Sequence, residues 1–75
     1  MGNLSGFKYR TVTERLGKLG FELDRHAGGS HEIWWNPTTR RRAIVPHHSR
    51  DIAEGTLRAM LREAGITPEQ FLAAR

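Results

Sequence analysis

A glycine pair, a serine and a histidine stand in a row at residues 28–31, between two segments with the residue pattern of β-strands. The glycines allow positive φ angles and a close approach of a ligand to the backbone. Imidazole is the side chain best suited to transfer protons near neutral pH. His31 is therefore the first candidate for chemistry, and the hydroxyl of Ser30 lies next to it in the sequence.

Arginine is the second residue type of chemical interest. Of the 12 Lys and Arg residues, ten are arginine, and the net charge is +4 with histidine neutral. A basic surface favours a polyanionic partner, either a nucleic acid or an acidic protein, although the same surplus also keeps a small domain soluble. The run Arg40, Arg41 and Arg42 directly follows a turn, and we interpret it as a candidate phosphate contact, with a charged strand edge as the alternative.

The other histidines are at positions 26, 47 and 48. No His-x3-His spacing and no carboxylate partner completes a metal-ligand set around His47 and His48, so we expect neither a metal nor a cofactor. The absence of cysteine excludes disulfides and thiolate–metal sites and fits a reducing compartment. Because no apolar run is long enough to span a membrane and the N-terminus lacks a signal-peptide pattern, we expect a cytoplasmic protein.

The elements that position these residues begin with a helix over Lys8 to Leu19. Apolar residues recur at helical spacing along it, and Gly20 is a natural stop. The apolar stripe consists of Tyr9, Val12, Leu16 and Leu19. Residues 11–14 also fit a capping box, which leaves open a start three residues later.

Three strand-like runs follow, joined by turns at residues 27–30 and 36–39. They cover residues 21–26, 31–36 and 40–45, and Pro46 ends the last one. Short turns predict a three-stranded antiparallel meander. In the first run we expect Phe21 and Leu23 to face the core.

Alternation in the second run separates its side chains into two sets. One face carries His31, Ile33 and Trp35, and the other carries Glu32 and Trp34. If Ile33 faces the core, His31 lies at the rim of the core face, where a bulge at the glycine pair would re-aim it.

The sequence pattern of the C-terminal part predicts two helices. One runs from Ala53 or Gly55 to Ala64 and is closed by Gly65. The other begins after Thr67, whose spacing to Gln70 predicts a capping box, and ends near residue 74. The chain over residues 1–75 is thus predicted to be one α+β domain in which helices cover one face of the sheet.

Short pieces spread over residues 8–71 resemble, in their order and spacing, the HicA family of bacterial toxins, small ribonucleases of toxin–antitoxin pairs. The pieces are Leu19-Gly20-Phe21, Gly29-Ser30-His31, Asn36-Pro37, Val45-Pro46-His47-His48, Gly55-Thr56-Leu57, and Leu61-Arg62-Glu63-Ala64-Gly65 leading to Phe71.

The resemblance implies a double-stranded-RNA-binding-domain-like fold of topology α-β-β-β-α, mRNA cleavage without a metal, and neutralisation by a HicB-type antitoxin. The catalytic histidine of the family corresponds to His31, and the histidine of its Pro-x-His motif corresponds to His48. Many members place an arginine three residues before the glycine of Gly-Ser-His. Here Arg25 stands four residues before Gly29, because Gly28 is an additional residue.

The residue types fit metal-free RNA cleavage. The 2′-OH of RNA is the nucleophile, a base removes its proton, an acid protonates the leaving 5′-oxygen, and cations stabilise the charge on the phosphate. We expect His31 to be the base or the acid, while His48, His47 and His26 remain open as the second group. The expected RNA-binding residues are Arg25, Ser30, Arg40, Arg41, Arg42 and His48.

Two other classes of function stay open. A non-catalytic RNA-binding domain would use the same fold and arginines, since duplex RNA is recognised largely through phosphates and 2′-OH groups. A protein-interaction module would instead bind an acidic partner through its basic face. Replacing His31 with alanine separates an enzyme from a binding domain. An antitoxin is expected to cover His31 and the arginines, because this masks cleavage and RNA affinity together.

Overall fold

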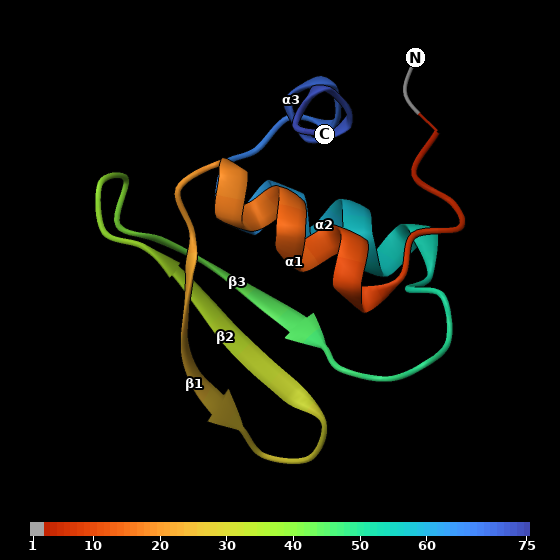
Figure 1. The fold of residues 1–75 in the computed structure, drawn as a ribbon, viewed down its shortest axis with the longest axis horizontal. Helices are drawn as coiled ribbons and strands as arrows, with labels where there is room; N and C mark the ends of the chain where they lie inside the picture. The colour runs from red at the N-terminus through yellow and green to blue at the C-terminus, as the bar shows by residue number, and fades with distance from the viewer. Residues whose placement is uncertain (1–2) are drawn as a thin grey trace.

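The computed structural model describes residues 3–75 as a three-stranded sheet with three helices (Figure 1). The elements are α1 (Tyr9–Lys18), β1 (Glu22–Ala27), β2 (His31–Asn36), β3 (Arg41–Pro46), α2 (Glu54–Ala64) and α3 (Pro68–Ala73). The strands are antiparallel and lie in the order β1-β2-β3. The structure confirms the α+β, double-stranded-RNA-binding-domain-like fold, and each element lies within one residue of its predicted bounds.

The helix ends differ in how they are capped. The capping box predicted for α3 is present, with the backbone N–H of Gln70 donating to Thr67 Oγ1 over 3.0 Å and Thr67 N–H donating to Gln70 Oε1 over 2.8 Å. The alternative start of α1 at residue 11 is wrong, because Thr13 Oγ1 donates to the Tyr9 carbonyl at 3.1 Å from inside the helix. Gly65 ends α2 in the left-handed conformation, with φ of 75°, which glycine adopts without steric cost.

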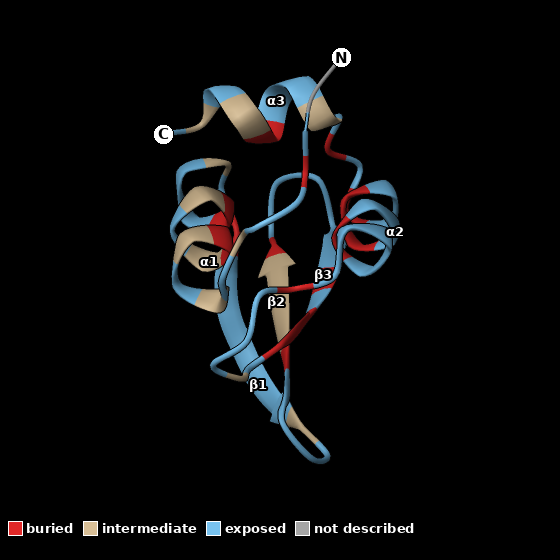
Figure 2. Cartoon of the chain, turned by 90° about the vertical axis from the view of Figure 1, so that its right-hand side faces the viewer, coloured by how far each residue is buried: buried red, intermediate tan, exposed pale blue. Residues whose placement is uncertain are grey.

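The core lies between the helices and one face of the sheet, and the buried positions of α1 and α2 face inward (Figure 2). Its members are Leu4, Val12, Leu16, Phe21, Ala43, Val45, Ile52, Leu57, Met60, Leu61, Ala64, Ile66 and Phe71. The stripes predicted for both long helices are therefore core. None of the helices in residues 3–75 has the length and apolarity needed to cross a membrane.

The strand register corrects the predicted core face of the sheet. Glu32 and Trp34 of β2 lie opposite Val45 and Ala43 of β3, both completely buried, so Glu32 and Trp34 face the helices. Ile33 pairs with Ile44, which is 41% exposed, on the other face. The condition under which His31 would lie at the rim of the core face, namely that Ile33 faces the core, is therefore not met. An alternating strand fixes two faces but not which one is covered.

Leu23 also departs from its predicted burial. The residue is 45% exposed, although Phe21 just before β1 is buried as expected. Helices α1 and α2 pack against β3, whereas β1, at the opposite edge of the sheet, is exposed along most of its length (Figures 1 and 2).

Candidate functional site

His31 is the first residue of β2 and is exposed on the face of the sheet that the helices leave uncovered. Its backbone pairs with Ala27 on one side and Pro46 on the other. The preceding turn contains Gly29 with φ of 70°, so the glycine pair serves to reverse the chain. Pairing is regular here, and the register shift in the β1–β2 pair lies between Leu23 and Arg25, not at the glycine pair, so no bulge there re-aims His31.

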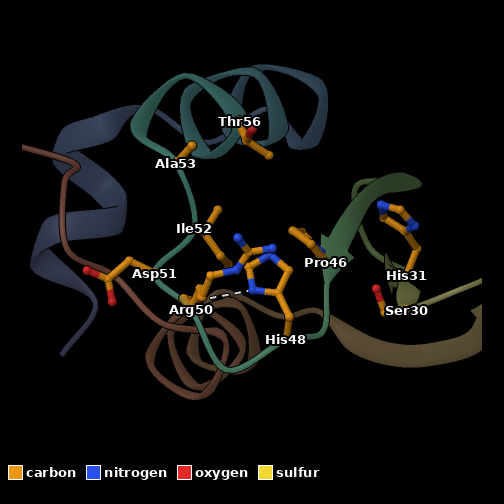
Figure 3. Close-up of a pocket in the computed structure, with 9 residues that line it drawn as sticks. All are labelled: Ser30, His31, Pro46, His48, Arg50, Asp51, Ile52, Ala53 and Thr56. Atoms are coloured by element: carbon orange, nitrogen blue, oxygen red, sulfur yellow. Dashed lines mark hydrogen bonds between the residues drawn. The ribbon is translucent and has the colours of Figure 1, made fainter.

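A pocket of about 430 Å³ opens beside His31 (Figure 3). Four segments build it: the β1–β2 turn, the end of β3, the loop that follows β3, and the start of α2. The lining residues are Ser30, His31, Pro46, His48, Arg50, Asp51, Ile52, Ala53 and Thr56. Two histidines that lie 17 positions apart in the printed sequence, His31 and His48, thus share one pocket with a guanidinium.

The loop after β3 is held at three points, which explains how His48 reaches the pocket. The backbone N–H of His47 donates to the carbonyl of Ser30, directly before His31. The His48 Nδ1 lies 3.1 Å from the carbonyl oxygen of Arg50. Ile52 is buried, and its N–H donates to the carbonyl of Phe7 over 2.7 Å. Backbone contacts and one buried side chain therefore fix this edge of the pocket.

The start of α2 gives the pocket an anion-binding character. Its N-cap residue, Ala53, provides no side-chain cap, so the N–H groups of the first turn are free to bind an anion. The positive end of the helix dipole and the positive charge of the Arg50 side chain also favour an anion at this place. Asp51 opposes them, but its carboxylate lies 3.0 Å from Lys8 Nζ. The pocket thus has a wall that favours an anionic group, and two imidazoles are among its lining residues.

Arg25 lies on the same face of the sheet as His31. The pairing of β1 with β2 shifts between Leu23 and Arg25, so Arg25 lies opposite Ile33. Without this irregularity, alternation from Leu23 would turn Arg25 toward the opposite face. The Arg25 guanidinium pairs with Asp24 over 2.7 Å at the surface. Arg25 is therefore a diagonal neighbour of His31, although it does not line the pocket.

The arginine run is not brought to the pocket. Arg40 precedes β3 in the turn with φ of 61°. The Arg41 guanidinium lies close to Gly65. A β-carbon added at Gly65 would come within 2.8 Å of the Nε atom of Arg41. Arg42 pairs with Trp35, about 13 Å along the strand from the His31 position by the usual rise per residue. RNA contact by these three arginines stays a prediction, separate from the pocket.

Six of the lining residues were not predicted as site residues, and three of these have polar side chains: Arg50, Asp51 and Thr56. Thr56 belongs to a piece that carries the family resemblance, Gly55-Thr56-Leu57, which was the available signal for it. Arg50 stands two residues after His48, but nothing in its neighbourhood distinguishes it from the other arginines.

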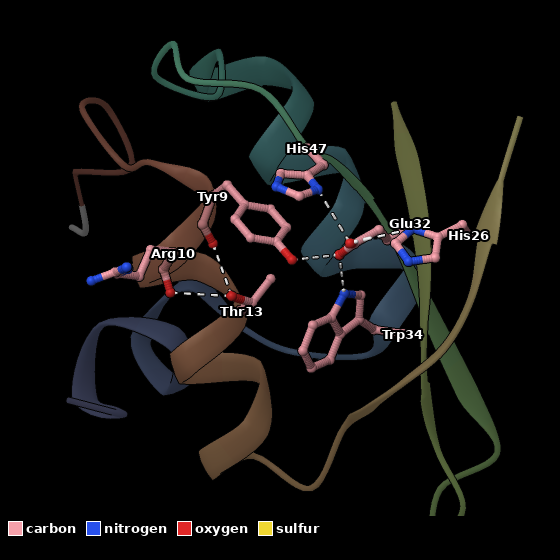
Figure 4. A network of polar contacts seen from close by, with 7 residues as sticks. All are labelled: Tyr9, Arg10, Thr13, His26, Glu32, Trp34 and His47. Carbon is pink, nitrogen blue, oxygen red and sulfur yellow. Dashed lines mark hydrogen bonds and ion pairs between the residues drawn. The ribbon is translucent and has the colours of Figure 1, made fainter. Parts of the chain in front are cut away.

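A second polar cluster lies on the opposite face of β2, around the buried carboxylate of Glu32 (Figure 4). Oε1 of Glu32 accepts from the Tyr9 hydroxyl at 2.7 Å and from Trp34 Nε1 at 3.1 Å. Oε2 lies 3.3 Å from His47 Nδ1 and 3.5 Å from His26 Nδ1. The Tyr9 and His47 rings stack at 4.0 Å between centroids, with 14° between their planes. This cluster connects α1, the sheet and the loop after β3.

The cluster shifts the pKa values of its two acidic members in opposite directions. Burial alone would raise the pKa of Glu32, but the hydrogen bonds from Tyr9 and Trp34 and the charges of His47 and His26 outweigh it and lower the pKa. Burial, the hydrogen bond to Glu32 and the charge of Glu32 raise the pKa of Tyr9 to about 12. Glu32 is thus held as a carboxylate and Tyr9 as a neutral hydroxyl donor.

Within residues 3–75, no group of three or more His, Asp or Glu side chains has an arrangement suited to a metal ion. A protein-family model described as HicA toxin of bacterial toxin–antitoxin matches residues 9–66, more than half of the chain. The match extends from the first residue of α1 to just past α2 and includes the pocket. Comparison with curated proteins gives no match.

Proposed function

The chain belongs to the HicA family of bacterial toxin–antitoxin toxins, and from this premise we propose that it is an endoribonuclease that cleaves mRNA with His31 as catalytic acid or base. The observation that carries the proposal is the shared pocket: His31 and His48 line it together with Arg50 and the uncapped start of α2. Two proton-transfer groups and an anion-binding wall are what cleavage of a phosphodiester requires.

In the proposed reaction the 2′-OH of one nucleotide attacks the adjacent phosphorus. One imidazole removes the 2′-OH proton as the new P–O bond forms. The bond from phosphorus to the 5′-oxygen breaks, and the second imidazole in its protonated form gives a proton to that oxygen. The products are a 2′,3′-cyclic phosphate and a free 5′-OH. His31 and His48 are assigned as this pair, and His48 is favoured over His26 and His47, which contact Glu32 on the other face.

The scissile phosphate is assigned to the wall formed by Arg50 and the first turn of α2. Backbone N–H groups and a guanidinium aimed at one anion stabilise the extra negative charge that develops on the phosphate during attack. Ser30 and Thr56 supply hydroxyls at the two sides of the pocket. Arg25, on the same sheet face as His31, is assigned to a phosphate outside the pocket.

Family membership also implies an antitoxin as partner. We propose that a HicB-type antitoxin covers the pocket and the neighbouring Arg25. His31 is exposed, and Arg25 is paired only at the surface, so a protein surface could reach both without unfolding the toxin. Covering this region would remove proton transfer and phosphate binding in one step.

The experiment that tests the function is cleavage of a mixed-sequence single-stranded RNA by the purified parent protein with EDTA present. The His31→Ala variant is assayed beside it, and His26→Ala is the matched control, because His26 is exposed and lies outside the pocket. We expect cleavage by the parent and the control, and a loss of about 10²–10⁴-fold in His31→Ala. The product ends should carry a 2′,3′-cyclic phosphate.

Three results would reject parts of this proposal. Abolition by EDTA would contradict metal-free cleavage, and a free 3′-OH on the products would contradict attack by the 2′-OH. RNA binding without cleavage by any variant would favour a non-catalytic RNA-binding domain. One observation supports that second candidate: within the described part of the chain, no hydrogen bond or ion pair orients the His31 imidazole (Figure 3).

A further inference from the structure

A second hollow lies on the other side of His48, and we call it the Arg10 groove. It has a volume of about 360 Å³ and is lined by Lys8, Tyr9, Arg10, His47, His48 and Ser49. His48 lines both this groove and the pocket beside His31. The two hollows are therefore neighbours that share one imidazole, and together they extend from β2 to the start of α1.

From this arrangement we infer that the Arg10 groove is a second RNA subsite, which takes a backbone phosphate of the strand whose scissile phosphate occupies the pocket. The inference rests on the proposed function and extends it from one phosphate to two. A single strand carries a phosphate at every nucleotide, so a strand that lies in the pocket and passes His48 brings further phosphates to the groove. The continuity of the hollows favours RNA over an acidic protein segment as the occupant.

The charges of the groove fit a phosphate. Two cationic side chains line it and no carboxylate does. Lys8 is engaged with Asp51 at 3.0 Å, whereas Arg10 is exposed and forms no ion pair within residues 3–75. A free guanidinium on a rigid helix can bind a phosphate in bidentate geometry. Arg10 is therefore the residue assigned to the phosphate.

The wall of the groove is held in place from behind. Tyr9 and His47 stack on each other, and both are anchored to the Glu32 carboxylate, whose side chain is only 3% exposed (Figure 4). A fixed wall lowers the conformational entropy lost on binding. The Glu32 cluster therefore has a role in the site, because it holds the imidazole of His47, the neighbour of His48 in the sequence, in one position.

The test uses an RNA that cannot be cleaved, with 2′-O-methyl groups at every position, in a dinucleotide and an octanucleotide form. Binding to the parent, Arg10→Ala and Lys18→Ala is measured by fluorescence anisotropy at several salt concentrations. Lys18→Ala is the matched control, because it also removes one exposed cation from α1, at the opposite end of the helix. Arg10→Lys checks whether charge alone restores binding.

We expect Arg10→Ala to weaken octanucleotide binding about threefold to tenfold and to lower the salt slope by about 0.7, the value for one lost phosphate contact on a single strand. The dinucleotide, too short to reach the groove, should bind equally to all variants. Arg10→Lys should recover only part of the affinity, because lysine restores the charge but cannot form the bidentate contact of a guanidinium. Lys18→Ala should stay close to the parent.

Equal losses in Arg10→Ala and Lys18→Ala would overturn the inference, since only net charge would then matter. Unchanged octanucleotide binding by Arg10→Ala would overturn it too, and weaker binding of a HicB-type antitoxin in that variant would assign the groove to an acidic protein. Because no cleavage is needed, these results are independent of the proposed catalysis. If the parent protein binds RNA but does not cleave it, the proposed catalysis is rejected, whereas the assignment of the Arg10 groove as an RNA subsite is not affected.

Discussion

Two adjacent residues of β2, His31 and Glu32, have opposite surroundings. His31 is exposed on the uncovered face of the sheet, and no hydrogen bond orients its ring within residues 3–75. Glu32 is 2% exposed and is surrounded by four polar side chains, from Tyr9, Trp34, His26 and His47. The pleat of one strand thus separates a free imidazole from a fully satisfied carboxylate.

The same contrast recurs in the loop after β3. His47 stacks on Tyr9 and approaches Glu32, while the next residue, His48, lines the pocket with His31. In each of the two adjacent pairs, His31–Glu32 and His47–His48, one histidine therefore lines the pocket, while its neighbour belongs to the buried cluster on the other face. The comparison teaches that the candidate chemistry is carried by side chains outside the Glu32 cluster, next to residues that this buried cluster holds in place.

The largest expected effect concerns the free imidazole. His31→Ala should lower RNA cleavage by about 10²–10⁴-fold and change the free energy of unfolding by no more than about 0.5 kcal/mol, because the side chain is exposed. Urea unfolding beside the cleavage assay measures both quantities. A large loss of stability in this variant would break the comparison, since His31 would then be a structural residue.

The opposite result is expected for the buried carboxylate. Glu32→Ala should lower the free energy of unfolding by about 2–4 kcal/mol, because the Tyr9 hydroxyl and the Trp34 indole N–H lose their acceptor. Glu14→Ala, which removes an exposed carboxylate of α1, is the control and should stay within about 0.5 kcal/mol of the parent. Equal urea midpoints for the two variants would mean that the cluster contributes no stability.

A smaller effect should appear in alkaline solution. The pKa of Tyr9 is raised from 10.0 to about 12, so the folded state keeps the proton more tightly than the unfolded state. The stabilisation is fully present below pH 10 and is lost as the pH rises through 12. Tyr9 is the one tyrosine of the chain, so near-ultraviolet absorbance reports its ionisation directly. Tyr9→Phe should remove this alkaline dependence, and an ordinary titration near pH 10 would contradict the buried hydrogen bond.

The smallest effect distinguishes two arginines on the uncovered face. Arg25 lies diagonally next to His31, whereas Arg42 lies opposite Trp35, toward the far end of the sheet. Arg25→Ala should therefore lower cleavage at limiting RNA about twofold to fivefold, in the range of an exposed charge contact, and Arg42→Ala should lower it less. The ratio of the two rates is the measurement. A larger loss of cleavage in Arg42→Ala than in Arg25→Ala would indicate that the bound RNA passes over the arginine run at residues 40–42.

Local sequence signals were sufficient for the elements. The helical stripe that contains Val12 and Leu16, the Thr67 capping box and the turns around Gly29 and Pro37 each depend on residues a few positions apart. Signals of that range can be recognised within a short segment of the sequence, so the bounds of the helices and strands could be predicted within one residue. The candidate His31 also came from a local piece, Gly29-Ser30-His31.

The face of the sheet could not be predicted in the same way. Alternation in β2 places Glu32 and Ile33 on opposite faces of the sheet. Hydrophobicity alone would predict that the face with Ile33 is the buried one. Glu32 is buried instead because Tyr9, 23 positions away, supplies a hydrogen-bond donor across the core. A buried carboxylate is tolerated only where partners satisfy it, and these partners come from other elements.

The sequence by itself determined the order of the elements and the basic charge, because each depends on composition or on short-range spacing. It was the resemblance to the HicA family that singled out His31, and its catalytic role stays a prediction. The tertiary structure decided which residues share the site. It placed His48 and Arg50 in the same pocket as His31, turned Arg25 to the same face as His31 through an irregular strand pairing, and placed Arg42 away from the pocket. Strand register and loop closure are long-range interactions, and no short segment of the chain specifies them.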